Sequence, residues 1–192
     1  MVQARPKFVT LLAAVAVTLA VVAIEAVKVQ VDHDKMFDFK PVRTWGWNPS
    51  GMGEVKMART QDDDPDAMTR RVEPVMRDAV AQEMKRLGLT EAAAAPDVTI
   101  TYFLLLTIST SAQQVGQFLP GTTAWALPPF AAQTQSLEIM NQGALVLDLR
   151  AKGEIVWRGV AQAQIEIGID DKKREARLRE GVRDLLKRYP PK

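Results

Sequence analysis

The stretch GALVLDLRAKGEIVWRGVAQAQIEIG, residues 143–168, decides the fold of this chain. Apolar residues alternate with polar or small ones on both sides of residues 151–153, which is typical of two antiparallel strands joined by a tight turn. One face of this hairpin is expected to pack against a helix, because small residues there leave room and a tryptophan fills the space at one end. The residues concerned are Gly159, Ala161, Ala163 and Trp157.

The other face of the hairpin carries Arg158 and Asp148. A three-residue turn places Trp157 across from Leu147, and it sets Arg158 diagonal to Asp148. The two charges are then within reach of an ion pair worth under about 1 kcal/mol if it is exposed. We interpret Arg158 as an architectural residue. The alternative is that it binds an anion, if the outer face of the sheet forms a groove.

The rest of the chain predicts an α+β domain, with an antiparallel sheet of about five strands and two amphipathic helices on one face. The order of the elements is β-β-α-β-β-β-α. Pro74 implies that the first helix either starts near Val72 or bends at the proline, and Gly88 ends it. The expected strands are residues 27–34, a short strand with Trp45 and Trp47 that stops at Asn48-Pro49, residues 95–110 and the two of the hairpin, and the expected helices are residues 68–87 and 171–189.

The strand over residues 95–110 is expected at the centre of the sheet, because both of its faces are partly apolar. Residues 111–142 follow it with Glu138 as their only charge, and such a long connection usually has a function or is disordered. We expect this segment or a partner to cover the sheet face away from the helices. That face is predicted to carry Phe103, Leu105, Val146, Val156 and Val160.

The composition excludes several kinds of site. The 192 residues include no cysteine, so disulfides, thiolate catalysis and zinc–thiolate sites are ruled out. His33 is the only histidine, which rules out histidine-rich metal sites. The formal net charge of +2 gives no field that would argue for nucleic acid. No cofactor or metal is expected, and the acidic cluster Asp62, Asp63, Asp64 and Asp66 is interpreted as a helix cap rather than a calcium loop.

The amino terminus has the pattern of an export signal. Arg5 and Lys7 precede an uncharged apolar run of 17 residues, Phe8 to Ile24. This run is either a signal peptide cleaved after Ala23 or Ala26, a retained membrane anchor, or a buried core helix. In the first two cases the domain works outside the cytoplasmic membrane, in the periplasm or cell envelope. We therefore divide the chain into residues 1–26, signal peptide or anchor, and residues 27–192, one domain.

Several segments, taken in order, resemble the bacterial domain-of-unknown-function 4136 (DUF4136) family. They are VQVDHD (29–34), FDFKPVRTWGW (37–47), DVTITY (97–102), GALVLDL with GEIVWRGVAQ (143–162) and VRDLLKRYPP (182–191). The resemblance implies an exported domain of Gram-negative envelopes, often a lipoprotein, with no established biochemical activity and no catalytic residues to carry over. The chain departs from this pattern in lacking the lipid-bearing cysteine, so it is not expected to be a lipoprotein. It also has a shortened turn between Leu149 and Ile155.

We expect a non-enzymatic envelope module that binds a protein or the membrane surface. One alternative is a carrier or sensor of a small amphipathic ligand, held between the sheet and residues 111–142. Another is a hydrolase that uses Asp32, Asp34 or Asp148. The basic last helix is interpreted as a solvated face, with attraction to anionic lipid or polymer as the alternative. The candidate contact residues are Phe118, Leu119, Trp125, Leu127, Phe130 and Arg158.

Overall fold

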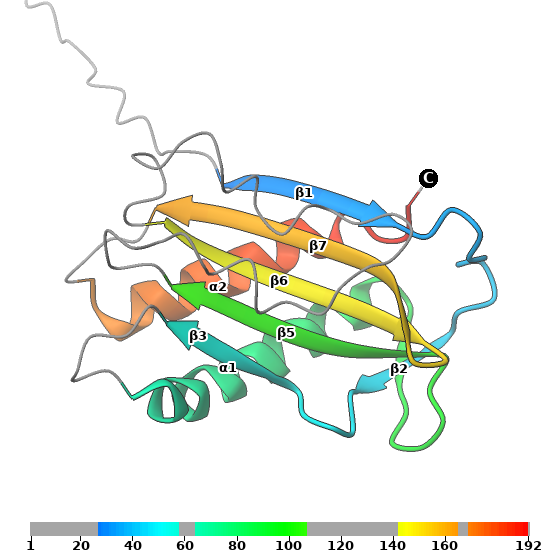
Figure 1. Cartoon of the computed structure of the whole chain (residues 1–192), viewed down its shortest axis with the longest axis horizontal. Coiled ribbons are helices and arrows are strands. Elements are labelled where there is room, and N and C mark those ends of the chain that lie inside the picture. The colour runs from blue at the N-terminus through cyan, green and yellow to red at the C-terminus, as the bar shows by residue number, and fades with distance from the viewer. Residues whose placement is uncertain (1–26, 58–63, 107–141, 165–168, 192) are drawn as a thin grey trace, which may run out of the picture.

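Figure 1 shows the fold as a computed structural model, which describes residues 27–57, 64–106, 142–164 and 169–191. Seven strands and two helices make up this part of the chain. Their bounds are β1 Lys28–His33, β2 Thr44–Trp47, β3 Gly53–Met57, α1 Pro65–Arg86, β4 Thr90–Glu91, β5 Val98–Leu106, β6 Gln142–Ala151, β7 Glu154–Gln164 and α2 Asp171–Leu186.

The described residues contain no helix that is long and apolar enough to cross a membrane. Residues 1–26 lie outside the described part of the chain, and so does the signal peptide or anchor predicted for them. The same holds for all of the segment 111–142 except Gln142.

The sheet is mixed, so the prediction of a purely antiparallel sheet was wrong. β1, β7, β6 and β5 lie side by side in that order and pair antiparallel. β2 and β3 both pair parallel with β5, and the short β4 pairs parallel with β2. The cause is α1, which lies between β3 and β5 in the chain. A helical crossover returns the chain in its original direction, so the strands that it connects run parallel. β3 was also missed, because no strand was predicted over residues 53–57.

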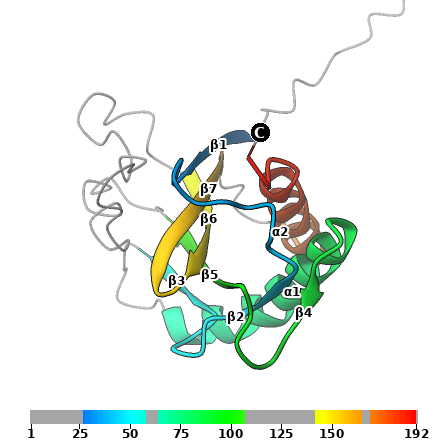
Figure 2. The same cartoon turned by 90° about the vertical axis from the view of Figure 1, so that its right-hand side faces the viewer.

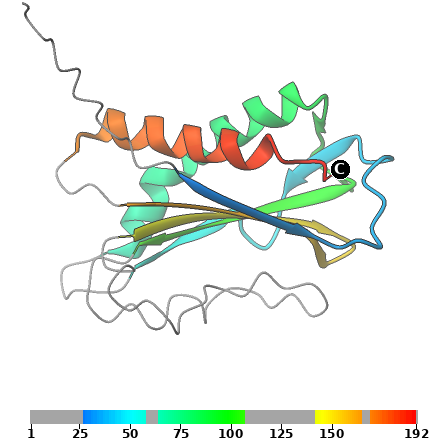
Figure 3. The same cartoon turned by 90° about the horizontal axis from the view of Figure 1, so that it is seen from above.

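Both helices lie on one face of the sheet, which confirms the predicted layering (Figures 2 and 3). β5 is apolar on both sides, as expected of a central strand. Ile100 and Tyr102 point toward the helices and belong to the main core, while Phe103 and Leu105 belong to a separate cluster on the opposite side. Both faces of β5 are therefore apolar, and the helices cover one of them.

α1 begins earlier than predicted because Asp64 caps it. One carboxylate oxygen of Asp64 accepts hydrogen bonds from the backbone N–H groups of Asp66 and Ala67, both at 3.0 Å, which satisfies donors that the helix itself leaves free. Pro74 lies on the exposed side of the helix without ending it. The capping role predicted for the acidic cluster is confirmed for Asp64, and a helix start near Val72 was wrong.

A second carboxylate, Asp97, holds β2 beside β5. It accepts hydrogen bonds from the backbone N–H groups of Arg43 at 2.9 Å and Thr44 at 2.8 Å, and from the Thr44 hydroxyl at 2.8 Å. These bonds favour the charged carboxylate, so they hold the pKa of Asp97 below its usual value.

The hairpin between β6 and β7 has a tighter turn than predicted. Lys152 and Gly153 adopt φ angles of 51° and 88°, and two positive φ angles in succession are typical of a two-residue type I′ turn. A bulge follows, because the register shifts between Leu149 and Arg150. The prediction of a three-residue turn was therefore wrong.

In this register, Trp157 and the residues after it on β7 pair with β6 residues two positions further along the chain than predicted. Trp157 pairs with Leu149 rather than with Leu147. Arg158 lies directly opposite Asp148, and not diagonal to it. The bulge also turns Val156 into the main core, although the sequence predicted it on the outer face.

Gly159 lets α2 approach the sheet closely, as predicted from the small residues of this strand. A Cβ atom at this position would lie 2.5 Å from Cη2 of Trp157 and 2.9 Å from Cδ2 of Leu185. Leu185 is a fully buried residue of α2. The missing side chain at Gly159 therefore makes room for the indole ring and for the helix.

We expect Gly159→Ala to lower the free energy of unfolding by roughly 1–3 kcal/mol, because overpacking forces side chains and backbone to shift. Urea denaturation measures this loss. Gly181→Ala is the matched control, since its Cβ would meet Cδ2 of Leu145 at an acceptable 3.4 Å. Alanine also favours a helix over glycine by about 1 kcal/mol, so this variant should be as stable as the parent or more stable. An equal loss in both variants would contradict the role of Gly159.

Aromatic side chains close the end of the core near the carboxyl terminus. The ring of Tyr189 lies edge-on to Trp157 at 5.9 Å and to Phe39 at 5.7 Å. Burial raises the pKa of Tyr189 to about 12, and the charge of Asp97 adds to the shift. Burial likewise raises the pKa of Tyr102 to about 12.

These are the only two tyrosines of the chain, so an alkaline titration followed by phenolate absorbance reads both of them. The folded protein should show no tyrosine ionising near pH 10 and both ionising near pH 12, whereas the protein in urea should titrate near 10. Because the folded pKa values are raised, the stability they contribute is fully present below about pH 10 and is lost toward pH 12. A phenol that titrates near 10 in the folded protein would show that one of these rings is not buried.

Candidate functional site

The candidate site is the face of the sheet away from the helices. Neither of the two described helices lies on this face (Figure 3). Every second residue of a strand points to the same side, and in this register Phe103 pairs with Val146, which in turn pairs with Val160. The result is an apolar cluster on the three central strands, which we call the sheet-face patch: Phe103, Leu105, Ala144, Val146 and Val160. All five side chains are buried.

A line of polar residues, the polar row, crosses the sheet beside the patch. Arg158 stands between two carboxylates, with Asp148 opposite it on β6 and Asp32 opposite it on β1. Thr101 pairs with Asp148 on the next strand. Its hydroxyl accepts a hydrogen bond from the side-chain amide of Asn48 at 3.1 Å. The row therefore runs without a break from β1 to the end of β2.

Arg158 and Asp148 form a bidentate ion pair in this row. Nε of Arg158 donates to Oδ1 of Asp148 and Nη2 donates to Oδ2, both at 2.6 Å. The small energy expected for an exposed pair does not apply, because the side chain of Arg158 is 2% exposed and that of Asp148 is 0% exposed. The bulge puts the two residues face to face, where the planar guanidinium matches the carboxylate.

Burial sets the energetics of this pair. It raises the pKa of Asp148, because removing a carboxylate from water disfavours its charged form, while the Arg158 guanidinium acts in the opposite direction. Buried ion pairs add little net stability, but removing one partner leaves a charge without compensation. The pair thus constrains what can lie on this face, because it requires dry and hydrogen-bonded surroundings.

Charged and polar side chains border the sheet-face patch on its two outer sides. On β3, Lys56 forms an ion pair with Glu54, and its ammonium lies 5.9 Å from the centre of the Phe103 ring. On β1, Gln30 is exposed and pairs with Val160. An apolar centre with a polar border is the arrangement found in protein–protein interfaces.

Arg150 is a residue that the sequence analysis did not single out. Nη1 of Arg150 donates to the carbonyl oxygen of Gly153 at 2.9 Å. Its Nε is buried and has no hydrogen-bond partner among the described residues. The charge of Arg150 also acts to lower the pKa of Asp148. Arg150 lies two residues after Asp148 on β6, so strand alternation places both on the same side of the sheet, and this signal could have found it in the sequence.

Of the candidate contact residues predicted from the sequence, the structure describes Arg158 alone. Its place in the polar row supports the architectural interpretation, and a role in anion binding stays a prediction. The other five lie outside the described residues: Phe118, Leu119, Trp125, Leu127 and Phe130.

The carboxylates proposed for a hydrolase do not form a pair. Asp148 is bound to Arg158, whose strand separates it from Asp32. The side chain of Asp32 accepts from the N–H of His33 at 2.9 Å, and that of Asp34 accepts from Met36 at 2.8 Å. Across the described part of the chain, no group of three or more acidic or histidine side chains could hold a metal ion.

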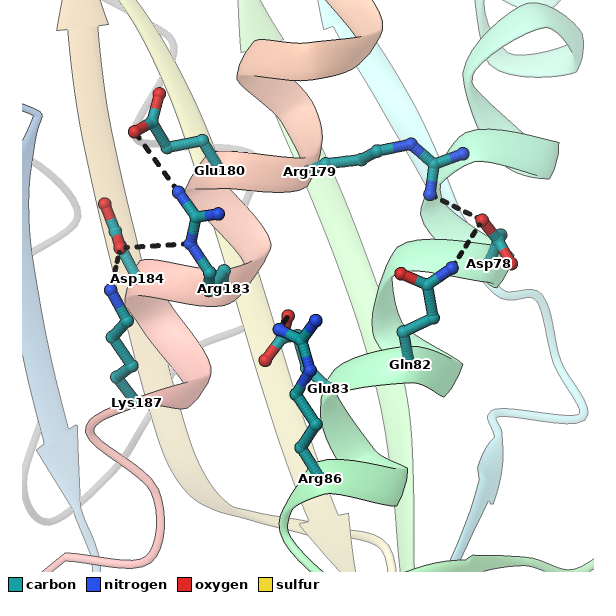
Figure 4. Close-up of polar contacts among 9 residues, drawn as sticks. All are labelled: Asp78, Gln82, Glu83, Arg86, Arg179, Glu180, Arg183, Asp184 and Lys187. Atoms are coloured by element: carbon teal, nitrogen blue, oxygen red, sulfur yellow. Dashed lines mark hydrogen bonds and ion pairs between the residues drawn. The ribbon is translucent and has the colours of Figure 1, made fainter.

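The outer surface of the two helices is a second polar region, and Figure 4 shows it. Asp78 of α1 accepts hydrogen bonds from Arg179 of α2 and from Gln82. Lys187 pairs with Asp184 at 2.9 Å. Exposed pairs of this kind contribute little stability, so these contacts match the solvated helix face that the sequence predicted.

The fold and the site together define an α+β domain that covers one face of its sheet with two helices and keeps an apolar patch on the other. The chain belongs to the DUF4136 family, a domain of unknown function that matches residues 29–191. The resemblance read from the sequence is confirmed.

Solved structures resemble this fold at low sequence identity. A PDZ domain protein from Parabacteroides distasonis is 16% identical with a TM-score of 0.54, over 85% of this chain and 35% of its own. This chain therefore spans only about a third of that protein. A DUF4136 family protein from Bacteroides thetaiotaomicron is 18% identical with a TM-score of 0.47, over 85% of this chain and 96% of its own. A PelC dodecamer from Paraburkholderia phytofirmans is 9% identical with a TM-score of 0.37, over 84% and 95% of the two chains. No curated protein matches the sequence.

We expect Arg158→Met alone to lower the free energy of unfolding by about 3–5 kcal/mol, because it leaves a buried carboxylate unpaired. The double variant Asp148→Leu/Arg158→Met should recover most of this loss, and urea denaturation of both variants measures the difference. The control is Arg174→Ala, which removes an exposed pair with Asp171 and should cost less than about 1 kcal/mol. A single variant that costs no more than this control would show that the pair is hydrated.

Proposed function

We propose that this protein is a non-enzymatic binding module of the bacterial cell envelope, which takes up an apolar polypeptide segment on the sheet-face patch. The observation that carries the proposal is the patch itself: five apolar side chains on the face away from the described helices, buried in this chain alone, which an incoming segment would reach by displacing what covers them. A protein gains little stability by placing a second apolar surface there unless something removes it from water.

The surroundings of the patch suit a specific contact. An incoming segment would find an apolar centre, with Lys56 and Glu54 along one side and Gln30 along the other. The polar row would limit which residues can lie at one end, because a buried charge tolerates only partners that satisfy its hydrogen bonds. Binding would therefore select for sequence as well as for apolar character.

The shifted ionisable groups favour binding over catalysis. Asp97 holds two strands together, and Asp148 is engaged by Arg158. Tyr102 and Tyr189 are buried in the main core. Each of these pKa shifts has a structural cause, whereas general acid–base catalysis needs a shifted group that can reach a substrate.

The segment predicted as the contact joins the patch through the chain. It follows Leu106, the last residue of β5, and ends at Gln142, the first of β6. Both strands contribute to the patch. We propose that Phe118, Leu119, Trp125, Leu127 and Phe130 act with the patch, because aromatic side chains contribute most to protein contacts.

Photo-crosslinking in living cells tests the proposal. A photoreactive residue replaces Trp125 in one variant and Gln30, beside the patch, in another, while Gln82 on the exposed side of α1 is the matched control. We expect one discrete protein adduct from positions 125 and 30 and none from position 82.

Two other outcomes would each overturn the proposal. Adducts within the chain alone would show that the protein covers the patch itself. Co-purified lipid in a mass spectrum, together with no protein adduct, would favour the carrier of a small amphipathic ligand. The apolar patch lies close to Arg158, and this closeness supports that alternative.

A further inference from the structure

The two edges of the described sheet differ in how they are closed. At one edge, the two-residue strand β4 pairs with β2, and the hydroxyl of Thr69 on α1 accepts a hydrogen bond from the backbone N–H of Val55 on β3 at 3.1 Å. The other edge is β1, which among the described strands pairs with β7 alone. No described helix or strand lies beyond it (Figures 1 and 3). In the described part of the chain, β1 is thus an edge to which a further strand can be added.

The hydrogen bonds of β1 show which backbone groups face this edge. The N–H of Asp34 donates to the carbonyl oxygen of Val156 on β7 at 2.9 Å. Alternate residues of an antiparallel strand bond to the same neighbour, so the even-numbered residues of β1 all face β7. The N–H and C=O groups of Val29 and Val31 therefore point away from β7, and no described strand pairs with them.

The side chains of β1 form a pattern that is complementary to itself. Lys28, Gln30 and Asp32 lie on the same face as the sheet-face patch, whereas Val29 and Val31 pack against the main core. If two β1 strands pair antiparallel with Gln30 opposite Gln30, Lys28 of each copy lies opposite Asp32 of the other. The outward N–H and C=O groups of Val29 then bond to those of Val31. Opposite charges and β-branched side chains directly across from each other stabilise a sheet.

The two charges of this pattern have no counterpart within the described part of the chain. Neither Lys28 nor Asp32 forms an ion pair with a described residue. Asp32 stands opposite Arg158, but that guanidinium is bonded to Asp148 through two nitrogens. One oxygen of Asp32 accepts from the N–H of His33 at 2.9 Å, and a second copy would place an ammonium beside this carboxylate. The register that joins the outward backbone groups therefore also pairs the charges.

We propose that two copies of this chain associate through β1, antiparallel and with Gln30 opposite Gln30, to form one continuous sheet. The contact is isologous, since the same residues of both copies meet around a two-fold axis. This axis is perpendicular to the sheet, so both copies turn the same face to the same side. The two sheet-face patches then lie on one surface of the dimer, and the helices lie on the other. The inference goes beyond the proposed function, because it does not depend on what binds the patch.

A single introduced cysteine tests the register, because the chain has none of its own. In the proposed dimer the two copies of Gln30 form a pair without backbone hydrogen bonds, in which the Cα atoms lie about 4.5 Å apart. A disulfide spans this distance. Gln30→Cys in the purified full chain, kept in detergent, should therefore give a disulfide-linked dimer on mild oxidation, and non-reducing electrophoresis measures its yield.

Lys28→Cys is the matched control on the same strand and the same face. The two copies of this residue would be four residues apart along the paired strands, or about 13 Å. Alone it should give at least about tenfold less linked dimer than Gln30→Cys, because a disulfide cannot span this distance. An equimolar mixture of Lys28→Cys with Asp32→Cys should link, since these positions lie opposite each other and the second Lys28–Asp32 pair is kept.

Charge reversal tests the pairing of Lys28 with Asp32 without a crosslink. Lys28→Glu places two carboxylates opposite each other at both ends of the contact, so sedimentation velocity should show about tenfold weaker association. Lys85→Glu, an equal change in charge at an exposed position of α1, should leave the association unchanged. Circular dichroism shows that each variant is folded.

Three outcomes would overturn the proposal: no linked dimer from Gln30→Cys, equal linkage from Gln30→Cys and Lys28→Cys, or equal weakening by both charge reversals. Each of them leaves the binding function open. In the photo-crosslinking experiment, a second copy joined at position 30 has the mass of two chains, which separates it from a different protein. The partner of the sheet-face patch is read from position 125, so failure of the dimer and failure of the binding function are told apart.

Discussion

The close contact between α2 and β7 at Gly159 is the constraint on which the rest of the domain depends. Because no side chain stands there, Leu185 and the indole of Trp157 can both lie directly over the strand. This brings the end of α2 down onto the sheet, where Tyr189 packs against Trp157. α1 then lies beside α2, and Arg179 links the two helices through Asp78. Both helices are thereby committed to one face of the sheet.

Because both helices lie on one face, the other face of the sheet keeps a separate apolar cluster. The three central strands are apolar on both sides, so the face without helices keeps its own cluster of buried side chains. The ion pair of Arg158 and Asp148 lies at the margin of this cluster, where burial makes the pair sensitive to whatever lies against it. A surface that is apolar at its centre and polar at its margin is suited to recognition, and this is why we propose it as the binding surface.

The sequence predicted those parts of the fold that depend on local periodicity. The alternation along β5 and the small residues of β7 placed both apolar surfaces, and the acidic cluster before α1 contained its cap. The sequence did not predict the parallel strands. Their direction is decided by the crossover of α1 and not by the residues of β2 or β3. The bulge at Leu149 was missed for a related reason: a one-residue insertion leaves the hydrophobic pattern readable but changes its register.

The same limit applies to the candidate site. Arg158 was singled out from the sequence, but its bidentate bond with Asp148 follows from the register and could not be derived from alternation alone. Arg150 could have been found, because it lies two residues after Asp148 on the same side of β6. The polar row joins residues from β1, β5, β6 and β7 with Asn48, which follows β2, and such a long-range arrangement has no signature in any single segment.

The pairing of β1 with β7 has a consequence for how the protein is made. β1 is the first strand that the structure describes, but its only partner among the described strands is the last of them, β7, with Lys28 opposite Gln162. During synthesis, which starts at the amino terminus, β1 emerges long before that partner exists. The sheet can be completed only when nearly the whole chain is available, and such distant pairings slow folding. The chain therefore remains open, and dependent on protection from aggregation, until its final third has arrived.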